Sequence, residues 1–309
     1  MKLKSMRNFL SRLTVGKYII ERFVGIPVRV EFASEFNYHS SPLTRTLVVG
    51  ITQSGETADT LEALRRAKRF GARTMAITNV LGSSVTRIVD KILYTRAGPE
   101  ICVAATKTFI AQLIVLYAMA FKLSGLPRSE VEGYMNELRL LSEKVRVILD
   151  RKDKIEEIAK ILSDYKNMLY IGRGLGYPTA LEGALKMKEI SYIHAEGYPA
   201  GELKHGPFAL LGRDTPVVAC VVKDETYEIM LNNVKEVKAR DSPVIAVAVD
   251  DDYEVEKFAD YVIRTPSVNP IFTPITYSVT LQLLAYYTAK ERGCEIDKPR
   301  HLAKSVTVE

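Results

Sequence analysis

A strand–turn–helix–strand pattern occurs twice in this chain and constrains its fold more than any other feature. The first copy runs from the apolar segment 47–51, through a turn and a helix-like stretch, to the apolar segment 74–78. The second copy repeats this order between segments 217–221 and 244–248, with nearly the same spacing. Short apolar strands that alternate with amphipathic helices are typical of a parallel sheet covered by helices on both faces. We therefore predict an α/β fold of two doubly wound domains related by a pseudo-twofold axis.

The domain boundary is expected in the charged, helix-like stretch 130–154. At 309 residues the chain is long enough for two domains of about 150 residues each. We predict a first domain over residues 1–135, a second over 136–297 and a C-terminal active-site tail over 298–309.

The composition is that of an ordinary soluble globular protein, with 47% apolar and 26% charged residues. Apolar runs stay well below the roughly 20 residues of a membrane span, so we expect no membrane partner. Basic and acidic residues are interleaved, and the net charge of +6 therefore does not predict a nucleic-acid partner. The three cysteines, Cys102, Cys220 and Cys294, have no metal-binding or disulfide spacing, which favours a reducing, cytoplasmic location.

The turn of the first repeat has the composition of an anion-binding site. It reads Thr52-Gln53-Ser54-Gly55-Glu56-Thr57 and lies between a predicted strand and a predicted helix. The free N–H groups and the positive dipole end of a helix N-terminus both point into such a turn. Because it contains no lysine, it differs from a Walker loop and suits one phosphate monoester better than a triphosphate. The alternative is an ordinary polar turn in which Ser54 or Thr57 caps the helix.

The equivalent turn of the second repeat differs in its chemistry. Val222-Lys223-Asp224 stands where the first repeat has Thr52-Gln53-Ser54. Lys223 and Asp224 make this turn less suited to hold a phosphate group. We therefore predict one phosphate site, in the first domain, and expect the second domain to supply other chemistry.

A further polar cluster lies between Leu181 and Pro207. Glu182, Lys186 and Glu189 follow i, i+4, i+7 spacing and share one face of a predicted helix. Such a pattern usually means a solvent-exposed ladder of salt bridges, and an active-site face is the alternative. A long Gly- and Pro-rich loop then leads to His205, and ordered loops of this kind often carry acid–base groups.

These motifs together resemble the glucosamine-6-phosphate synthase family. The resemblance is carried by the segments TQSGETADTL, ALEGALKMKEISYIHAEGYPAGELKHGP and DKPRHLAKSVTVE. It extends from about Gly16 to Glu309 and corresponds to the isomerase half of that family, which consists of two sugar-isomerase (SIS) domains. The resemblance implies action on fructose 6-phosphate by a homodimer, without a metal or organic cofactor.

The resemblance also implies roles for individual residues. Glu189 would move a proton between C1 and C2 of the opened sugar, and Lys304 would form a Schiff base with the C2 ketone. His205 would assist ring opening across the dimer interface, while Lys186 and Glu182 would support the catalytic helix face. The substrate would be held by the side chains of Thr52, Gln53, Ser54 and Thr57 and by the backbone of Val103 and Ala303.

The chain also departs from the family. The resemblance does not include the family's glutamine-hydrolysing domain, so we expect ammonia from solution or from a separate glutaminase partner. The family's first strand and its Gly-Thr-Ser turn are also not recognisable, because the stretch 8–13 has helical spacing. Ala105 replaces a hydroxyl-bearing residue of the family, which removes one expected substrate contact.

A missing first strand would be a serious defect in a doubly wound sheet. That strand is usually central, and its loss would leave backbone groups unpaired on both neighbours. We expect upstream residues or a neighbouring element to fill the gap. In place of the strand, the sequence shows the apolar spacing of a helix. The residues with this spacing are Leu3, Met6, Leu10, Leu13, Ile20 and Phe23.

Other functions stay open at the level of the sequence. One is an amino-sugar-phosphate deaminase that runs the reverse reaction; others are a non-catalytic SIS regulator and an inactive chain. The presence of Glu189, His205 and Lys304 favours an enzyme, because a regulator needs only the phosphate site. The remaining histidines are isolated and are expected to be surface or packing residues; they are His39, His194 and His301.

Overall fold

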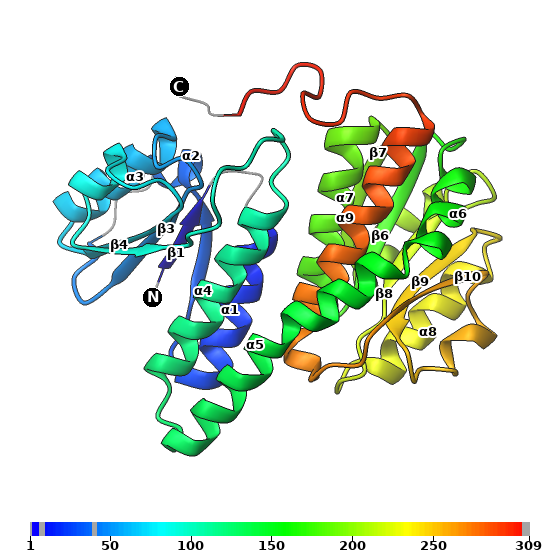
Figure 1. Ribbon diagram of the computed structural model, residues 1–309, viewed down its shortest axis with the longest axis horizontal. Coiled ribbons are helices and arrows are strands. Elements are labelled where there is room, and N and C mark those ends of the chain that lie inside the picture. The colour runs from blue at the N-terminus through cyan, green and yellow to red at the C-terminus, as the bar shows by residue number, and fades with distance from the viewer. Residues whose placement is uncertain (1, 6–9, 39–41, 305–309) are drawn as a thin grey trace. The chain divides into compact units, whose positions relative to one another are not determined.

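The computed structural model describes residues 2–5, 10–38 and 42–304, which group into two compact units (Figure 1). Unit 1 comprises Met1–Met135 and His301–Glu309, and unit 2 comprises Asn136–Arg300. Each unit contains a five-stranded parallel sheet. The predicted α/β class with two parallel sheets is therefore confirmed. Among the described residues, no helix is both long and apolar enough to cross a membrane.

Unit 1 is built around a parallel sheet with the strand order β2-β1-β3-β4-β5. Helices α2 and α3 pack together on one face of this sheet, and α1 and α4 pack together on the other (Figure 1). The elements are β1 (Lys2–Ser5), α1 (Leu10–Val24), β2 (Arg29–Phe32), α2 (Ala33–Phe36), β3 (Leu47–Ile51), α3 (Ala58–Arg69), β4 (Arg73–Thr78), η2 (Ser84–Arg87), β5 (Lys91–Tyr94), α4 (Lys107–Leu123) and α5 (Arg128–Asp150), which continues into unit 2.

Close packing of α3 on the sheet explains the apolar pattern of the first repeat. Leu61 and Leu64 of α3 are buried in one core cluster with Val48 and Ala76 of the sheet. At Gly50 an added Cβ would lie 2.7 Å from Leu64 Cδ1, so the glycine allows the helix to approach the strand closely. This packing positions the N-terminus of α3, and with it the turn that follows β3.

Unit 2 repeats this architecture, with the strand order β10-β9-β8-β6-β7. Counted from the first strand of each unit, both sheets have the order 2-1-3-4-5. Helix α8 covers one face, and α6, α7 and α9 cover the other (Figure 1). The elements are α6 (Lys152–Leu162), β6 (Asn167–Gly172), α7 (Gly176–Ser191), β7 (His194–Pro199), η3 (Ala200–His205), η4 (Pro207–Leu210), β8 (Val217–Cys220), α8 (Tyr227–Lys238), β9 (Val244–Val249), η5 (Val255–Lys257), β10 (Tyr261–Thr265), η6 (Pro270–Phe272) and α9 (Thr273–Glu291).

The expected gap at the centre of the first sheet does not exist. Residues Lys2–Ser5 form β1, which pairs with β2 on one side and with β3 on the other. The helical spacing was misleading at its start, since α1 begins only at Leu10. Extended chain is favoured here because β2 and β3 would otherwise each leave backbone groups unpaired. Of the stretch 8–13, in which the family's Gly-Thr-Ser turn is not recognisable, residues 10–13 begin α1 and residues 8–9 lie outside the described residues.

Candidate active site

The turn after β3 is held in shape by its own hydroxyl groups. Thr52 is buried, and its Oγ1 lies 3.1 Å from Thr57 Oγ1 and accepts a 3.1 Å hydrogen bond from the N–H of Gly55. Ser54 Oγ accepts a hydrogen bond from the N–H of Glu56 at 3.2 Å. Thr57 occupies the N-cap position of α3, but its side chain does not cap the helix. The alternative in which Thr57 caps the helix is therefore wrong.

The loop after β4 braces the same turn. Gly55 has a φ of +75°, and an added Cβ would lie 2.1 Å from Ser83 Oγ, so only glycine fits this position. Glu56 Oε1 accepts a hydrogen bond of 2.7 Å from the N–H of Ser84. Hydrogen bonds from Ser84 hold the pKa of the Glu56 carboxyl below its ordinary value. The acidic side chain of the turn is thus bound to the neighbouring loop.

A groove of about 670 Å³ extends from Gln53 along the carboxyl edge of this sheet. Its volume lies within the range of small-molecule sites. The lining includes Lys304, from the part of the tail that belongs to unit 1. The structure therefore brings the turn that was predicted to bind phosphate and the lysine that was predicted to form the Schiff base to one groove. The lining residues are Gln53, Asn79, Val80, Leu81, Tyr94, Arg96, Gly98, Pro99, Glu100 and Lys304.

The C-terminal tail contacts the loop that precedes α4. Lys304 Nζ donates a hydrogen bond to the backbone carbonyl of Cys102. Val103, the next residue of this loop, is half-buried, and Ala303 in the tail is exposed. Residues 305–309, which form the SVTVE ending, lie outside the described residues. Within unit 1, the loop and the tail thus bring two of the predicted substrate-binding segments to the same place.

Glu100 anchors the loop that Lys304 contacts. Its carboxylate accepts hydrogen bonds from the N–H of Thr106 at 3.3 Å and from the N–H of Thr108 at 3.0 Å. The hydroxyls of both threonines also donate to it. Burial opposes its ionisation, but these hydrogen bonds and the charge of Lys304 outweigh burial and hold the pKa of Glu100 below its ordinary value.

In unit 2, the polar face of α7 is buried. The side chains of Glu182, Lys186 and Glu189 are 0%, 3% and 9% exposed. Lys186 Nζ lies 3.8 Å from Glu182 Oε1 and forms a closer ion pair with Glu189. The interpretation as a solvated salt-bridge ladder is therefore wrong. Burying charges costs free energy, and their pairing offsets this cost only in part. Such a cluster is therefore weak evidence for a stabilising role, which favours the interpretation of this helix face as part of an active site.

The segment that leads to His205 is more regular than the long loop predicted from its glycines and prolines. It forms the edge strand β7, paired in parallel with β6, and the short helices η3 and η4. Ala200 and Leu203 are fully buried and anchor η3 in the core. His205 ends η3, is exposed, and its side chain makes no hydrogen bond with other described residues. Its role across a dimer interface stays a prediction.

The turn after β8 in unit 2 carries its own anion. Asp224 Oδ1 accepts hydrogen bonds from the N–H of Thr226 at 2.8 Å and from its hydroxyl at 2.7 Å. The carboxylate thus occupies the N-terminal end of α8, where a phosphate would otherwise be attracted. This arrangement supports the prediction that only the first turn suits phosphate.

Of the other histidines, the two that the structure describes lie at the surface. The side chain of His194 is 66% exposed and lies beside Glu196 and Asn167. His301 is exposed, and His39 lies outside the described residues. Over the described ranges, no three His, Cys, Asp or Glu side chains gather in a way that could hold a metal ion.

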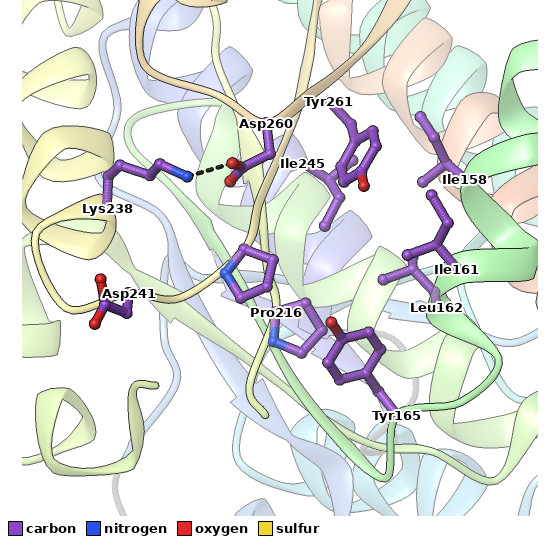
Figure 2. Close-up of a pocket in the computed structure, with 11 residues that line it drawn as sticks. Ile158, Ile161, Leu162, Tyr165, Pro216, Lys238, Asp241, Ile245, Asp260 and Tyr261 are labelled. Carbon is purple, nitrogen blue, oxygen red and sulfur yellow. Dashed lines mark hydrogen bonds and ion pairs between the residues drawn. The ribbon is translucent and has the colours of Figure 1, made fainter. Parts of the chain in front are cut away.

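A separate pocket lies at the amino edge of the second sheet (Figure 2). Its charged residues Lys238 and Asp260 pair with each other, and Asp260 Oδ2 accepts a hydrogen bond of 2.8 Å from the N–H of Val244. The rest of its wall is largely apolar and includes Ile158, Ile245 and Tyr261. These charged groups hold the sheet edge together, so this pocket is not the candidate active site.

Sequence reasoning missed Asn79 and Glu100. Asn79 directly follows β4, donates to the carbonyl of Gly98 at 2.8 Å and accepts from the N–H of Ala97 at 2.9 Å. A polar residue at the carboxyl end of a parallel strand was an available signal for it. Glu100 offered no such signal, because its partners lie six and eight residues further on, at the N-terminus of α4.

Two parallel sheets of the same strand order, one with a hydroxyl-rich turn at its carboxyl edge, define a tandem α/β protein of the flavodoxin-like type. More particularly, the chain belongs to the SIS domain family, whose pattern matches residues 14–122 and 161–292.

Known proteins confirm the resemblance to the glucosamine-6-phosphate synthase family. The chain is 53% identical over 300 residues to a glutamine–fructose-6-phosphate aminotransferase (isomerizing) of Methanosarcina mazei, which covers 96% of this chain and 48% of that protein. It thus spans about half the length of the curated relatives it matches. The C-terminal domain of glucosamine-fructose-6-phosphate aminotransferase from Francisella tularensis matches with a TM-score of 0.91 and 37% identity, over 96% of this chain and 85% of that one.

A glucosamine-6-phosphate deaminase from Thermotoga maritima also has this fold. Its structure matches with a TM-score of 0.79 over 99% of this chain and 89% of that one. At 23% identity, this likeness concerns the fold alone.

Proposed function

We propose that this chain is the isomerase portion of a glutamine–fructose-6-phosphate aminotransferase, which converts fructose 6-phosphate and ammonia into glucosamine 6-phosphate. The observation that carries the proposal is the presence of Lys304 in the same groove as Gln53. A phosphate turn alone would serve any sugar-phosphate-binding protein, whereas an amine beside it can form a Schiff base with a ketone. The names of the relatives support the same substrate.

In the proposed complex, the phosphate group binds in the turn between β3 and α3. Thr52 and Thr57 maintain the shape of the turn through their hydrogen bond, and the half-buried Gln53 and Ser54 turn to the ligand. The N-terminus of α3 adds N–H groups and its dipole. The backbone of Val103 and of Ala303 would contact the sugar.

The proposed reaction divides among three side chains. The amine of Lys304 attacks the C2 ketone of the open-chain sugar, and the ketone oxygen leaves as water. Ammonia then displaces the lysine at C2, and Glu189 transfers a proton from C1 to C2. The ion pair with Lys186 holds the Glu189 carboxylate, and Glu182 completes that cluster. His205 assists ring opening.

We also propose that the active form is a cytoplasmic homodimer. The side chain of His205 is exposed and forms no hydrogen bond with the described residues, so a second subunit provides a place for it to act. Ammonia would come from a glutaminase, either joined to this sequence or present as a separate partner. Sedimentation of the chain with and without fructose 6-phosphate tests the dimer.

The central experiment measures formation of glucosamine 6-phosphate from fructose 6-phosphate and ammonium ions. The wild-type chain should turn over, and Lys304→Ala should lose at least about a thousandfold in rate while still binding the sugar phosphate. Binding without turnover in the wild type would contradict the proposal and favour a sugar-phosphate regulator. Net release of ammonia from glucosamine 6-phosphate, with no synthesis, would favour the deaminase.

A further inference from the structure

We propose that Glu100 is a positioning residue for Lys304. The carboxylate of Glu100 keeps the lysine nitrogen positively charged over the groove, both before and after the Schiff base forms. This inference rests on the proposed function, because it concerns the imine that Lys304 would form there. Both side chains line the same groove and belong to unit 1.

Glu100 is fixed more firmly than an ordinary surface carboxylate. It receives hydrogen bonds from two N–H groups and two hydroxyls, all supplied by Thr106 and Thr108. The N–H groups belong to the N-terminus of α4, whose dipole favours a negative charge. A carboxylate with four donors retains its ionised form and its place, so it can act on a neighbour through its charge.

Lys304 is held by the same short loop. Its ammonium group donates to the carbonyl of Cys102, two residues after Glu100. The charge of Lys304 contributes to the lowered pKa of Glu100, after burial and the threonine hydrogen bonds, so the two groups interact electrostatically. Of the described residues that line the groove, Glu100 alone carries a negative charge. Besides Lys304, the groove is lined by one further charged side chain, that of Arg96, and by the titratable hydroxyl of Tyr94.

The chemistry explains why a fixed negative charge is useful here. When an ammonium group and a ketone form a protonated imine, the N–C2 bond forms, the C2–O bonds break, and oxygen leaves as water. The positive charge is therefore conserved. A protonated imine withdraws electrons from C2, which makes C2 easier for ammonia to attack, whereas a neutral imine does so poorly. Glu100 favours the charged form throughout.

The test separates the charge of Glu100 from its structural role. Glu100→Gln keeps the size of the side chain and removes the charge, and Thr108→Val removes one donor and keeps the charge. The adduct with fructose 6-phosphate is trapped by sodium cyanoborohydride across a pH series and detected by intact mass, with Lys304→Ala as the control for the site. Steady-state formation of glucosamine 6-phosphate from fructose 6-phosphate and ammonium ions is measured in parallel.

At low pH the trapping rate falls because the Lys304 amine is protonated, and this part of the pH profile is its acid limb. In Glu100→Gln, the acid limb should move to lower pH by about one unit or more, because the Lys304 amine loses its proton more easily. Formation of glucosamine 6-phosphate should nevertheless slow by about tenfold, since the imine that ammonia attacks is less often protonated. A purely structural role would lower both rates without moving the limb, as expected for Thr108→Val.

An acid limb unchanged in Glu100→Gln, or moved equally in Thr108→Val, would overturn the role of Glu100 and leave the proposed function intact. If the wild-type chain binds fructose 6-phosphate but forms no adduct at Lys304, the inference and the proposed function fail together.

Discussion

The ammonium group of Lys68 lies 2.8 Å from the carboxylate of Asp90 at the amino edge of the first sheet. Asp90 also accepts a hydrogen bond of 2.8 Å from the N–H of Thr74, 16 residues earlier. In unit 2, Asp260 pairs with Lys238 and accepts from an N–H at the same separation (Figure 2). The internal repeat thus extends from the strands to a side-chain anchor that ties the last two strands of each sheet together.

Asp90→Asn should lower the free energy of unfolding by about 1 kcal/mol at pH 7, a value reduced for solvent screening of a partly exposed pair. Lys68, and then hydrogen bonds from Thr74, lower the pKa of Asp90 from 3.8 to about 2. Because the folded-state pKa is depressed, this stabilisation is present above about pH 4 and is lost as the pH falls toward 2. Urea unfolding at pH 7 and pH 3 measures it, and a pH-independent deficit would contradict the electrostatic explanation.

Gly55→Ala should weaken fructose 6-phosphate binding by at least about tenfold and destabilise the chain by about 1–3 kcal/mol. The added methyl group requires a φ of +75° and would lie 2.1 Å from Ser83 Oγ, which displaces the phosphate turn. Gly25→Ala is the matched control, because Gly25 has a φ of +70° but an added Cβ there meets nothing within 4 Å. Calorimetric titration should show normal affinity in the control; equal losses in both variants would mean that the turn has no special role.

Lys186→Met should destabilise the chain by about 3–5 kcal/mol, because it leaves two carboxylates on α7 buried without the cation between them. Adding Glu182→Gln to this variant should recover part of the loss, since one of the two charges is then removed. Thermal unfolding of Lys186→Met, Glu182→Gln and the double variant forms a mutant cycle that measures the coupling between these two side chains. If Lys186→Met were as stable as the wild type, Lys186 would not be neutralising two buried carboxylates on α7.

Asp224→Ala should destabilise the chain by about 1 kcal/mol through loss of the bond to the N–H of Thr226, without changing fructose 6-phosphate affinity. Ser54→Ala in the first turn should instead weaken binding by about fivefold, because it removes a donor from the proposed phosphate site. Chemical unfolding and binding titrations on both variants make the comparison. A loss of affinity in Asp224→Ala would assign phosphate binding to the second turn as well.

Much of this protein could be predicted from its sequence, because the decisive patterns are local. The alternation of strand, turn and helix specifies a parallel sheet, and the composition of Thr52–Thr57 selects the turn whose Gln53 lines the same groove as Lys304. The spacing of Glu182, Lys186 and Glu189 correctly places them on one helix face. Each of these inferences depends on residues within one or two turns of chain.

Tertiary structure decided the features that depend on distant partners. Lys2–Ser5 is a strand because β2 and β3, far along the chain, both need hydrogen-bonding partners, and the local helical spacing could not reveal this. The cluster on α7 is buried rather than solvated, since other elements cover that face. Glu100 and Lys304 line the same groove although about 200 residues separate them in the chain. The sequence by itself thus determined the fold class and the residues available for chemistry, whereas backbone pairing, burial and long-range charge decided their environment.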